Sequence, residues 1–165
     1  MRTYLTELIE RMTLEERGVN SADSVSWHAH REAEQLHDLS LVGELANFIE
    51  SNPTPQKRAA AYFIIGLIGK NCEATECARI LIGFAGREKD KYALSSLLGR
   101  LADIPKSEQT NLEPLFALLT DKRWLVRHAT IQSLINVSSP EPEDRLLELL
   151  VSTSDAQDVV YCQAT

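Results

Sequence analysis

The sequence lacks the features that mark membrane-spanning and disulfide-stabilised proteins. Its longest apolar stretch, residues 59–68, is broken by Gly66 and is far shorter than the roughly 20 residues that cross a bilayer. The N-terminus carries acidic residues, unlike a secretory signal. The three cysteines are an odd number in a chain that does not need disulfides. These absences predict reduced thiols in a cytoplasmic protein with no membrane contact.

Motifs of catalysis and of cofactor binding are also missing. The chain contains no phosphate-binding loop, nucleophile elbow or HExxH motif. His30, Glu34 and His37 would share one face of a helix, but the two histidines are about 10 Å apart along its axis, too far to share one zinc ion. The spacing of Cys72 and Cys77 is not that of a zinc knuckle, and we interpret both as small buried hydrophobic residues. We therefore expect no enzymatic activity, no cofactor and no metal site.

The net charge of −7 is unevenly distributed along the chain. Residues 1–51 carry four basic and ten acidic side chains (−6), and residues 139–165 carry one and six (−5). Residues 52–138 carry twelve basic and eight acidic side chains (+4). A chance distribution over solvated faces is one interpretation of this imbalance. The functional interpretation is a binding surface for an acidic partner, flanked by acidic ends.

Apolar residues recur at helical spacing along the whole chain, and no stretch alternates like a strand. Helices are expected at residues 3–12 and from residue 23 or 24 to 38, the second with Val25, Ala29 and Ala33 facing inward. We interpret these first 38 residues as an N-terminal cap. Further helices are expected at 41–50, 56–70, 73–86, 89–103, 108–120, 122–137, 143–152 and from 154 or 155 onward. Proline-containing segments at 51–55, 104–107 and 138–142 interrupt this succession.

A period close to 35 residues runs through the helices that follow the cap. In the first helix of each pair, apolar residues repeat at that spacing, and in the second helix a small residue precedes a bulky one by two positions. A single pair of this size cannot bury its apolar face, so neighbouring pairs must stack. The repeating sets are Leu45, Ile80 and Leu115; Ile49, Phe84 and Leu119; and Ala60/Tyr62, Ser95/Leu97 and Ala129/Ile131, with Leu146 and Leu150 in a shortened fourth unit.

One unit carries this pattern most completely. It consists of Leu118, Leu119, Thr120 and Asp121, followed by Val126, Arg127, Ala129 and Leu134. The unit resembles the consensus of the HEAT repeats, a family of HEAT-like (PBS-lyase-type) α-solenoids. The 56–70 unit keeps Arg58 but has a proline-rich loop where the aspartate belongs, and Ala93 occupies the position of the next arginine.

This resemblance implies an all-α fold, a right-handed α-α superhelix of the HEAT or armadillo type. It implies a cap at residues 1–38 and repeats at 39–71, 72–104 and 105–138, with a partial repeat at 139–165. In the family, the aspartate and the arginine stabilise the turn between the two helices. The resemblance therefore implies a structural role for Asp121 and Arg127.

The second helices of such repeats line the concave face, which gives the expected binding surface. Trp124 is its most informative residue, because an aromatic ring among cationic side chains at a helix start suits an anionic or stacked ligand. The alternative is that the indole fills the gap between repeats. We expect a non-enzymatic scaffold or adaptor for a protein partner, an acidic partner being one option. The expected row is Lys57, Arg58, Lys91, Tyr92, Trp124, Arg127, His128 and Gln132.

Two other functions stay open. Residues 124–127 are similar to a segment of the DNA-alkylation-repair glycosylases built from HEAT-like repeats, in which Trp and Arg side chains hold the DNA backbone. The acidic net charge is wrong for a protein that binds duplex DNA. The chain also has no second tryptophan pair with a nearby aspartate, since Trp27 lies in the cap. An inhibitor or immunity-type protein would instead use the acidic flanks against a basic partner. Val159, Val160 and Ala164 begin an apolar stripe, so a longer chain, a partner or a second copy is expected to cover the C-terminal end.

Overall fold

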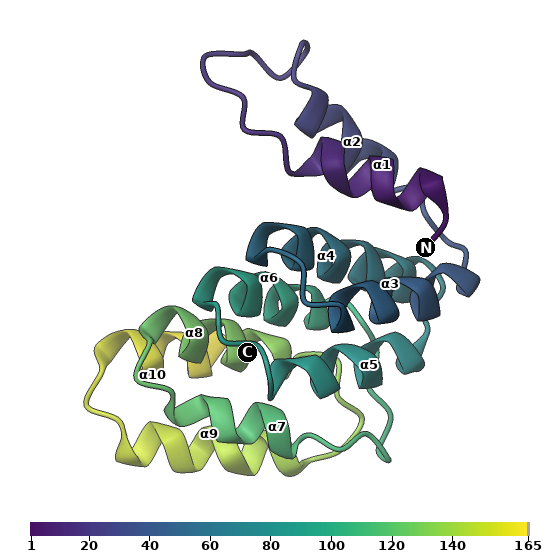
Figure 1. The fold of residues 1–165 in the computed structure, drawn as a ribbon. Helices are drawn as coiled ribbons and strands as arrows, with labels where there is room; N and C mark the ends of the chain where they lie inside the picture. The colour runs from purple at the N-terminus through teal and green to yellow at the C-terminus, as the bar shows by residue number, and fades with distance from the viewer. Residues whose placement is uncertain (165) are drawn as a thin grey trace.

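The computed structural model describes residues 1–164, which are helical apart from their connecting loops (Figure 1). Thr165 and the side chain of Ala164, at the end of the expected C-terminal stripe, lie outside the described part. No helix of that part is long and apolar enough to cross a membrane. The helices are α1 Thr3–Met12, α2 Val25–Ala33, α3 Ser40–Glu50, α4 Pro55–Asn71, α5 Thr75–Ala85, α6 Lys91–Leu101, α7 Glu113–Phe116, the 3-10 helix η1 Ala117–Thr120, α8 Trp124–Ser133, α9 Glu141–Ser152 and α10 Ala156–Ala164.

Most of the expected helices form within two residues of their predicted limits, but the helix expected to reach residue 38 ends at Ala33. Two further departures have local causes. The helix expected from residue 108 begins only at Glu113, because Pro114 lacks an amide hydrogen and fits only the first turn of a helix. The helix expected to reach residue 137 ends at Ser133. Beyond it the chain turns through Asn136, whose φ of 60° is left-handed and cannot continue a right-handed helix.

The helices after α2 form two layers (Figure 1). One layer contains α4, α6, α8 and α10, and within it α4 packs against α6, α6 against α8, and α8 against α10. The bulky residues predicted to fill this layer, Tyr62, Leu97 and Ile131, are at most 1% exposed. The other layer contains α3, α5, α7 and α9. There Ile80 departs from the expected pattern, because it is only half-buried and Leu81 beside it is fully buried.

The hairpin of α1 and α2 packs on α4 mainly through α1 (Figure 1). Ala29 and Ala33 of α2 are fully buried as expected, but Val25 is 40% exposed. Val25 lies at the first turn of α2, where its backbone amide and that of Ser26 donate to the carboxylate of Glu16 at 3.0 and 2.9 Å. This carboxylate caps the helix and holds its start at the surface of the hairpin.

Side chains at or after the C-terminal ends of α4, α6 and α8 tie successive helix pairs together. Asn71 donates through Nδ2 to a carbonyl that follows α2, at 2.8 Å, and Asn136 donates in the same way to the carbonyl of Ala102 after α6, also at 2.8 Å. Lys106 is fully buried, and its Nζ donates to three carbonyls, one of them that of Ile135 at 2.7 Å. Burial lowers the pKa of Lys106 to about 8.

Two glycines allow α4 to approach its neighbours closely. A Cβ atom on Gly66 would lie 2.4 Å from Cβ of Arg100 in α6, and one on Gly69 would lie 2.7 Å from Cβ of Cys77 in α5. Both distances are too short for real side chains, so larger residues would push the helices apart. Gly43 in α3, by contrast, has open space where a Cβ would be.

We predict that Gly66→Ala destabilises the fold by about 2 kcal/mol, because the added methyl group overpacks the contact between α4 and α6. Gly43→Ala is the matched control and should stabilise the fold by about 0.5–1 kcal/mol, since alanine favours the helix and meets no neighbour. Urea denaturation of the two variants measures both free energies of unfolding. Equal effects of the two substitutions would contradict the close contact.

Candidate binding surface

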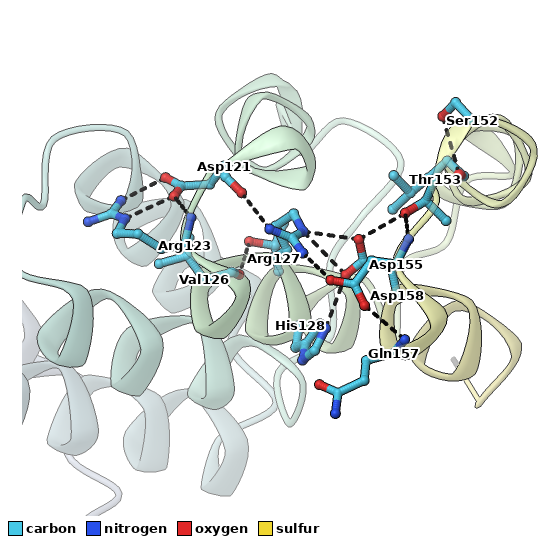
Figure 2. A network of polar contacts seen from close by, with 12 residues as sticks. Asp121, Arg123, Val126, Arg127, His128, Ser152, Thr153, Asp155, Gln157 and Asp158 are labelled. Atoms are coloured by element: carbon cyan, nitrogen blue, oxygen red, sulfur yellow. Dashed lines mark hydrogen bonds and ion pairs between the residues drawn. The ribbon is translucent and has the colours of Figure 1, made fainter.

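The start of α8 is fixed by a turn built on Asp121 and Arg123 (Figure 2). The carboxylate of Asp121 accepts from the backbone amide of Arg123 at 2.8 Å and from its guanidinium at 2.7 and 2.9 Å. These bonds to Arg123 lower the pKa of Asp121. Arg123 also donates through Nη1 to the carbonyl of Lys89 at 3.1 Å, which ties the start of α8 to the start of α6. Trp124, the first residue of α8, is 58% exposed.

The start of α6 presents a second exposed aromatic ring. Asp90 caps this helix by accepting from the backbone amides of Tyr92 and Ala93 at 3.0 and 2.9 Å. Tyr92 is 66% exposed, and Nζ of Lys91 lies 4.7 Å from the centre of its ring. Together, the two helix starts present exposed aromatic rings beside exposed lysines. We call this the basic–aromatic surface; it consists of Lys89, Lys91, Tyr92, Lys122 and Trp124.

Other members of the expected row are engaged within the fold. Lys57 forms an ion pair with Glu10 of α1, which ties it to the N-terminal hairpin. Arg58 and Arg127 have side chains only 14% and 16% exposed and bind carboxylates. His128 is 3% exposed, so it is a buried residue and not part of a free surface. Gln132 is exposed, two turns along α8 from Trp124.

Arg58 belongs to a buried network at the start of α4. Its Nε and Nη2 donate to the two carboxylate oxygens of Glu88, in the loop before α6, at 2.7 and 2.8 Å. Its Nη1 donates to the carbonyl of Pro53 at 2.6 Å, and the hydroxyl of Tyr62 donates to Glu88 at 3.0 Å. Burial raises the pKa of Glu88, but its bonds to Arg58, the Asp90 amide and Tyr62 outweigh this and lower it to about 2. Glu88 therefore stays ionised and links α4 to the next helix pair.

Arg127 forms the equivalent network at the other end of the layer (Figure 2). Its Nη1 donates to the carbonyl of Asp121 at 3.1 Å, in the loop before its own helix. Its Nη2 donates to Asp155 at 2.7 Å, and its Nε donates to Asp158 at 3.0 Å. The guanidinium thus joins the turn before α8 to the start of α10. This geometry supports the structural role that the HEAT resemblance implied for Arg127.

His128 lies beneath Trp124 and shares the carboxylate of Asp158. Its Nε2 is 3.0 Å from Oδ1 of Asp158, and its ring stacks on that of Tyr161 in α10 with the ring centres 4.1 Å apart. The ring of Trp124 lies 5.5 Å from that of His128 at a tilted angle. Asp158 and Tyr161 lie about thirty residues after His128 in the sequence, and no spacing rule links them. Sequence reasoning therefore missed this cluster.

His128, Asp155 and Asp158 bring three ligand-type atoms within 4.8 Å of one another. Their carboxylate oxygens already accept hydrogen bonds from Arg127, and Thr153 donates to Asp158 at 3.1 Å. The guanidinium supplies the positive charge that a metal ion would otherwise bring. The two carboxylates are thus already neutralised within the protein, which does not suit a metal ion, while Nδ1 of His128 is buried without a hydrogen-bond partner.

The histidines and cysteines considered for metal binding are separately engaged. His30 and His37 each bond through Nδ1 to a backbone carbonyl of their own segment, at 2.8 and 2.9 Å, and Glu34 pairs with Arg31. The thiol of Cys72 lies 3.0 Å from a backbone carbonyl. All three cysteines are free, and burial raises the pKa of the Cys77 thiol to about 11.

Comparison with protein-family models and with curated proteins finds no match to this chain. The basic–aromatic surface and the networks beneath it therefore stand on their geometry alone.

We predict that Glu88 makes the fold sensitive to acid. Its pKa is about 2 in the folded chain and near its ordinary value of 4.5 when unfolded, so its stabilising effect is present above 4.5 and is lost as the pH falls towards 2. The stability difference between wild type and Glu88→Gln should shrink by about 2 kcal/mol from about pH 6 to about pH 3. Urea denaturation at each pH measures it. Glu108→Gln, at an exposed side chain, should show no such change.

Arg127→Met should destabilise the fold by about 3 kcal/mol, because Asp155 and Asp158 would lose their shared cation. The loosening should be local, and amide hydrogen exchange should accelerate most in α9 and α10. Arg79→Met removes an exposed ion pair with Glu76 and should leave exchange unchanged. Uniform acceleration throughout the chain would argue against a local link between α8 and α10.

Proposed function

We propose that the chain is a non-enzymatic interaction module that binds a protein partner through the basic–aromatic surface. The observation that carries this proposal is the exposure of Tyr92 and Trp124 at the starts of two packed helices, each beside exposed lysines. Tyr and Trp are the residue types most enriched at the energetic centres of protein interfaces. Large aromatic rings held in place by turns at their bases bind with little loss of conformational entropy.

The fold proposed for this module is a right-handed α-α superhelix of HEAT-like repeats with an N-terminal cap. Its support is the succession of contacts from α4 through α6 and α8 to α10. Further support comes from the equivalent positions of Arg58 and Arg127, each bonded to a carbonyl of the loop before its own helix and to a carboxylate of a later loop or helix start. Such links between repeats suit an elongated stack in which each unit contacts its neighbours.

The charge of the surface favours a protein partner over nucleic acid. Its basic side chains are Lys89, Lys91 and Lys122, while the neighbouring Arg123 is already paired with Asp121. Three free cations on a chain with a net charge of −7 neutralise few phosphates. A peptide segment with scattered acidic residues needs fewer cations and also gains from the two rings.

The test is a double substitution, Tyr92→Ser with Trp124→Ser, in a tagged chain used for quantitative affinity purification. Bound proteins should fall at least about ten-fold, because a lost aromatic hot spot weakens binding by that much or more. The matched control is Tyr4→Ser with Trp27→Ser, which removes two exposed rings from the N-terminal hairpin and should change nothing.

A salt titration with a labelled DNA duplex separates the nucleic-acid alternative. The proposal expects no binding at low salt, whereas a duplex-binding protein would bind and lose affinity steeply as salt rises. Such binding, or equal capture of proteins by the variant and the wild type, would overturn the proposal.

A further inference from the structure

Helix α9 presents an exposed stripe that is both acidic and aliphatic. Asp144, Leu147, Glu148 and Val151 occur at positions i, i+3, i+4 and i+7, which places them on one face of the helix. Leu147 is 53% exposed and Val151 is 90% exposed. Arg145 turns away towards α7, where its guanidinium lies 5.3 Å from the ring centre of Phe116, although it also contacts Glu148 at 3.4 Å. We call these four residues the acidic–aliphatic stripe.

The stripe borders a cavity of a size that could receive an aromatic ring. The cavity has a volume of about 500 Å³ and lies between α9 and the loop that follows α8. Leu147 lines it together with Ile135, Leu146, Leu150 and Cys162. Protein cavities of roughly 150 Å³ accept a benzene ring. The cavity is therefore large enough for an indole, and aliphatic side chains and Glu143 are among the residues that line it.

The acidic–aliphatic stripe and the basic–aromatic surface complement each other in charge and in shape. One carries carboxylates beside an apolar cavity, and the other carries lysines beside two protruding rings. We propose that the partner is a second copy of this chain, whose α9 stripe docks on the basic–aromatic surface of the first. This inference rests on the proposed function and names its partner.

The distribution of charge selects this arrangement over simple end-to-end stacking. Residues 1–51 carry a net charge of −6 and residues 139–165 carry −5, so contact between the two ends would bring like charges together. The stripe instead meets residues 52–138, which carry +4. The contact joins two different surfaces, so in a head-to-tail pair one copy keeps a free stripe and the other keeps a free basic–aromatic surface. Such a heterologous contact can continue into chains or close into rings.

The experiment uses sedimentation velocity over a range of concentrations and two charge-reversed variants. Lys91→Glu with Lys122→Glu reverses one surface, and Asp144→Lys with Glu148→Lys reverses the other. The wild type should self-associate, more strongly at low salt, and each variant alone should associate at least about ten-fold more weakly. An equimolar mixture of the two variants should associate again, since each brings the opposite charge to the other.

A control and three outcomes decide the test. Lys70→Glu with Arg79→Glu makes the same change of net charge as the lysine variant at a different place and should leave self-association intact. Circular dichroism should show native helix content in every variant. Wild-type chain that stays monomeric at all concentrations, or a mixture that fails to recover association, overturns the second-copy inference. In either case, loss of another captured protein by the Tyr92→Ser, Trp124→Ser variant leaves the proposed function standing. Self-association that persists in that variant overturns the docking surface itself.

Discussion

The arrangement of this protein depends on two largely buried guanidinium groups, those of Arg58 and Arg127, which each link the loop before their own helix to a later helix pair. Arg58 and Arg127 each hold a carbonyl of the loop before their own helix and a carboxylate from a later one. A helix pair alone leaves an apolar face exposed, and apolar contact by itself is non-directional. The guanidinium fork has fixed geometry, so it sets how one pair is placed on the next.

The seam between α6 and α8, that is, the contact where these two helices pack, has no such guanidinium group. Ala93 occupies the position where an arginine would lie, and carbonyl groups take the place of carboxylates as acceptors. Arg123 reaches back to the carbonyl of Lys89, and Lys106 donates to the carbonyl of Ile135. The result is that the turn before α8 is shaped by Asp121 and Arg123, and this turn exposes Trp124. The basic–aromatic surface thus lies at the contact between α6 and α8, which no guanidinium–carboxylate link crosses.

Sequence patterns predicted the helices well, because each helix is a local structure with its own spacing and breakers. The limits of α1 and the burial of Tyr62 followed from periodicity alone. The exposed fraction of single polar side chains could not be predicted from periodicity. His128 was expected on a surface because Trp124 and Arg127 are its neighbours in sequence, yet Asp158 and the helix that carries it cover it. Contacts between residues thirty positions apart leave no trace in a local pattern.

The hydrogen-bond acceptors at the contacts between helices differ in whether they titrate, and this affects which contacts weaken first as the pH falls. Carboxylates hold Arg58 and Arg127 at the two outer seams, whereas backbone carbonyls, which do not titrate, hold the central seam. Protonation of Glu88, whose pKa is about 2 in the folded chain, therefore removes the link between Arg58 and the loop before α6. Acid should thus weaken the contact of α4 with α6 before that of α6 with α8, the two helices that carry the exposed rings.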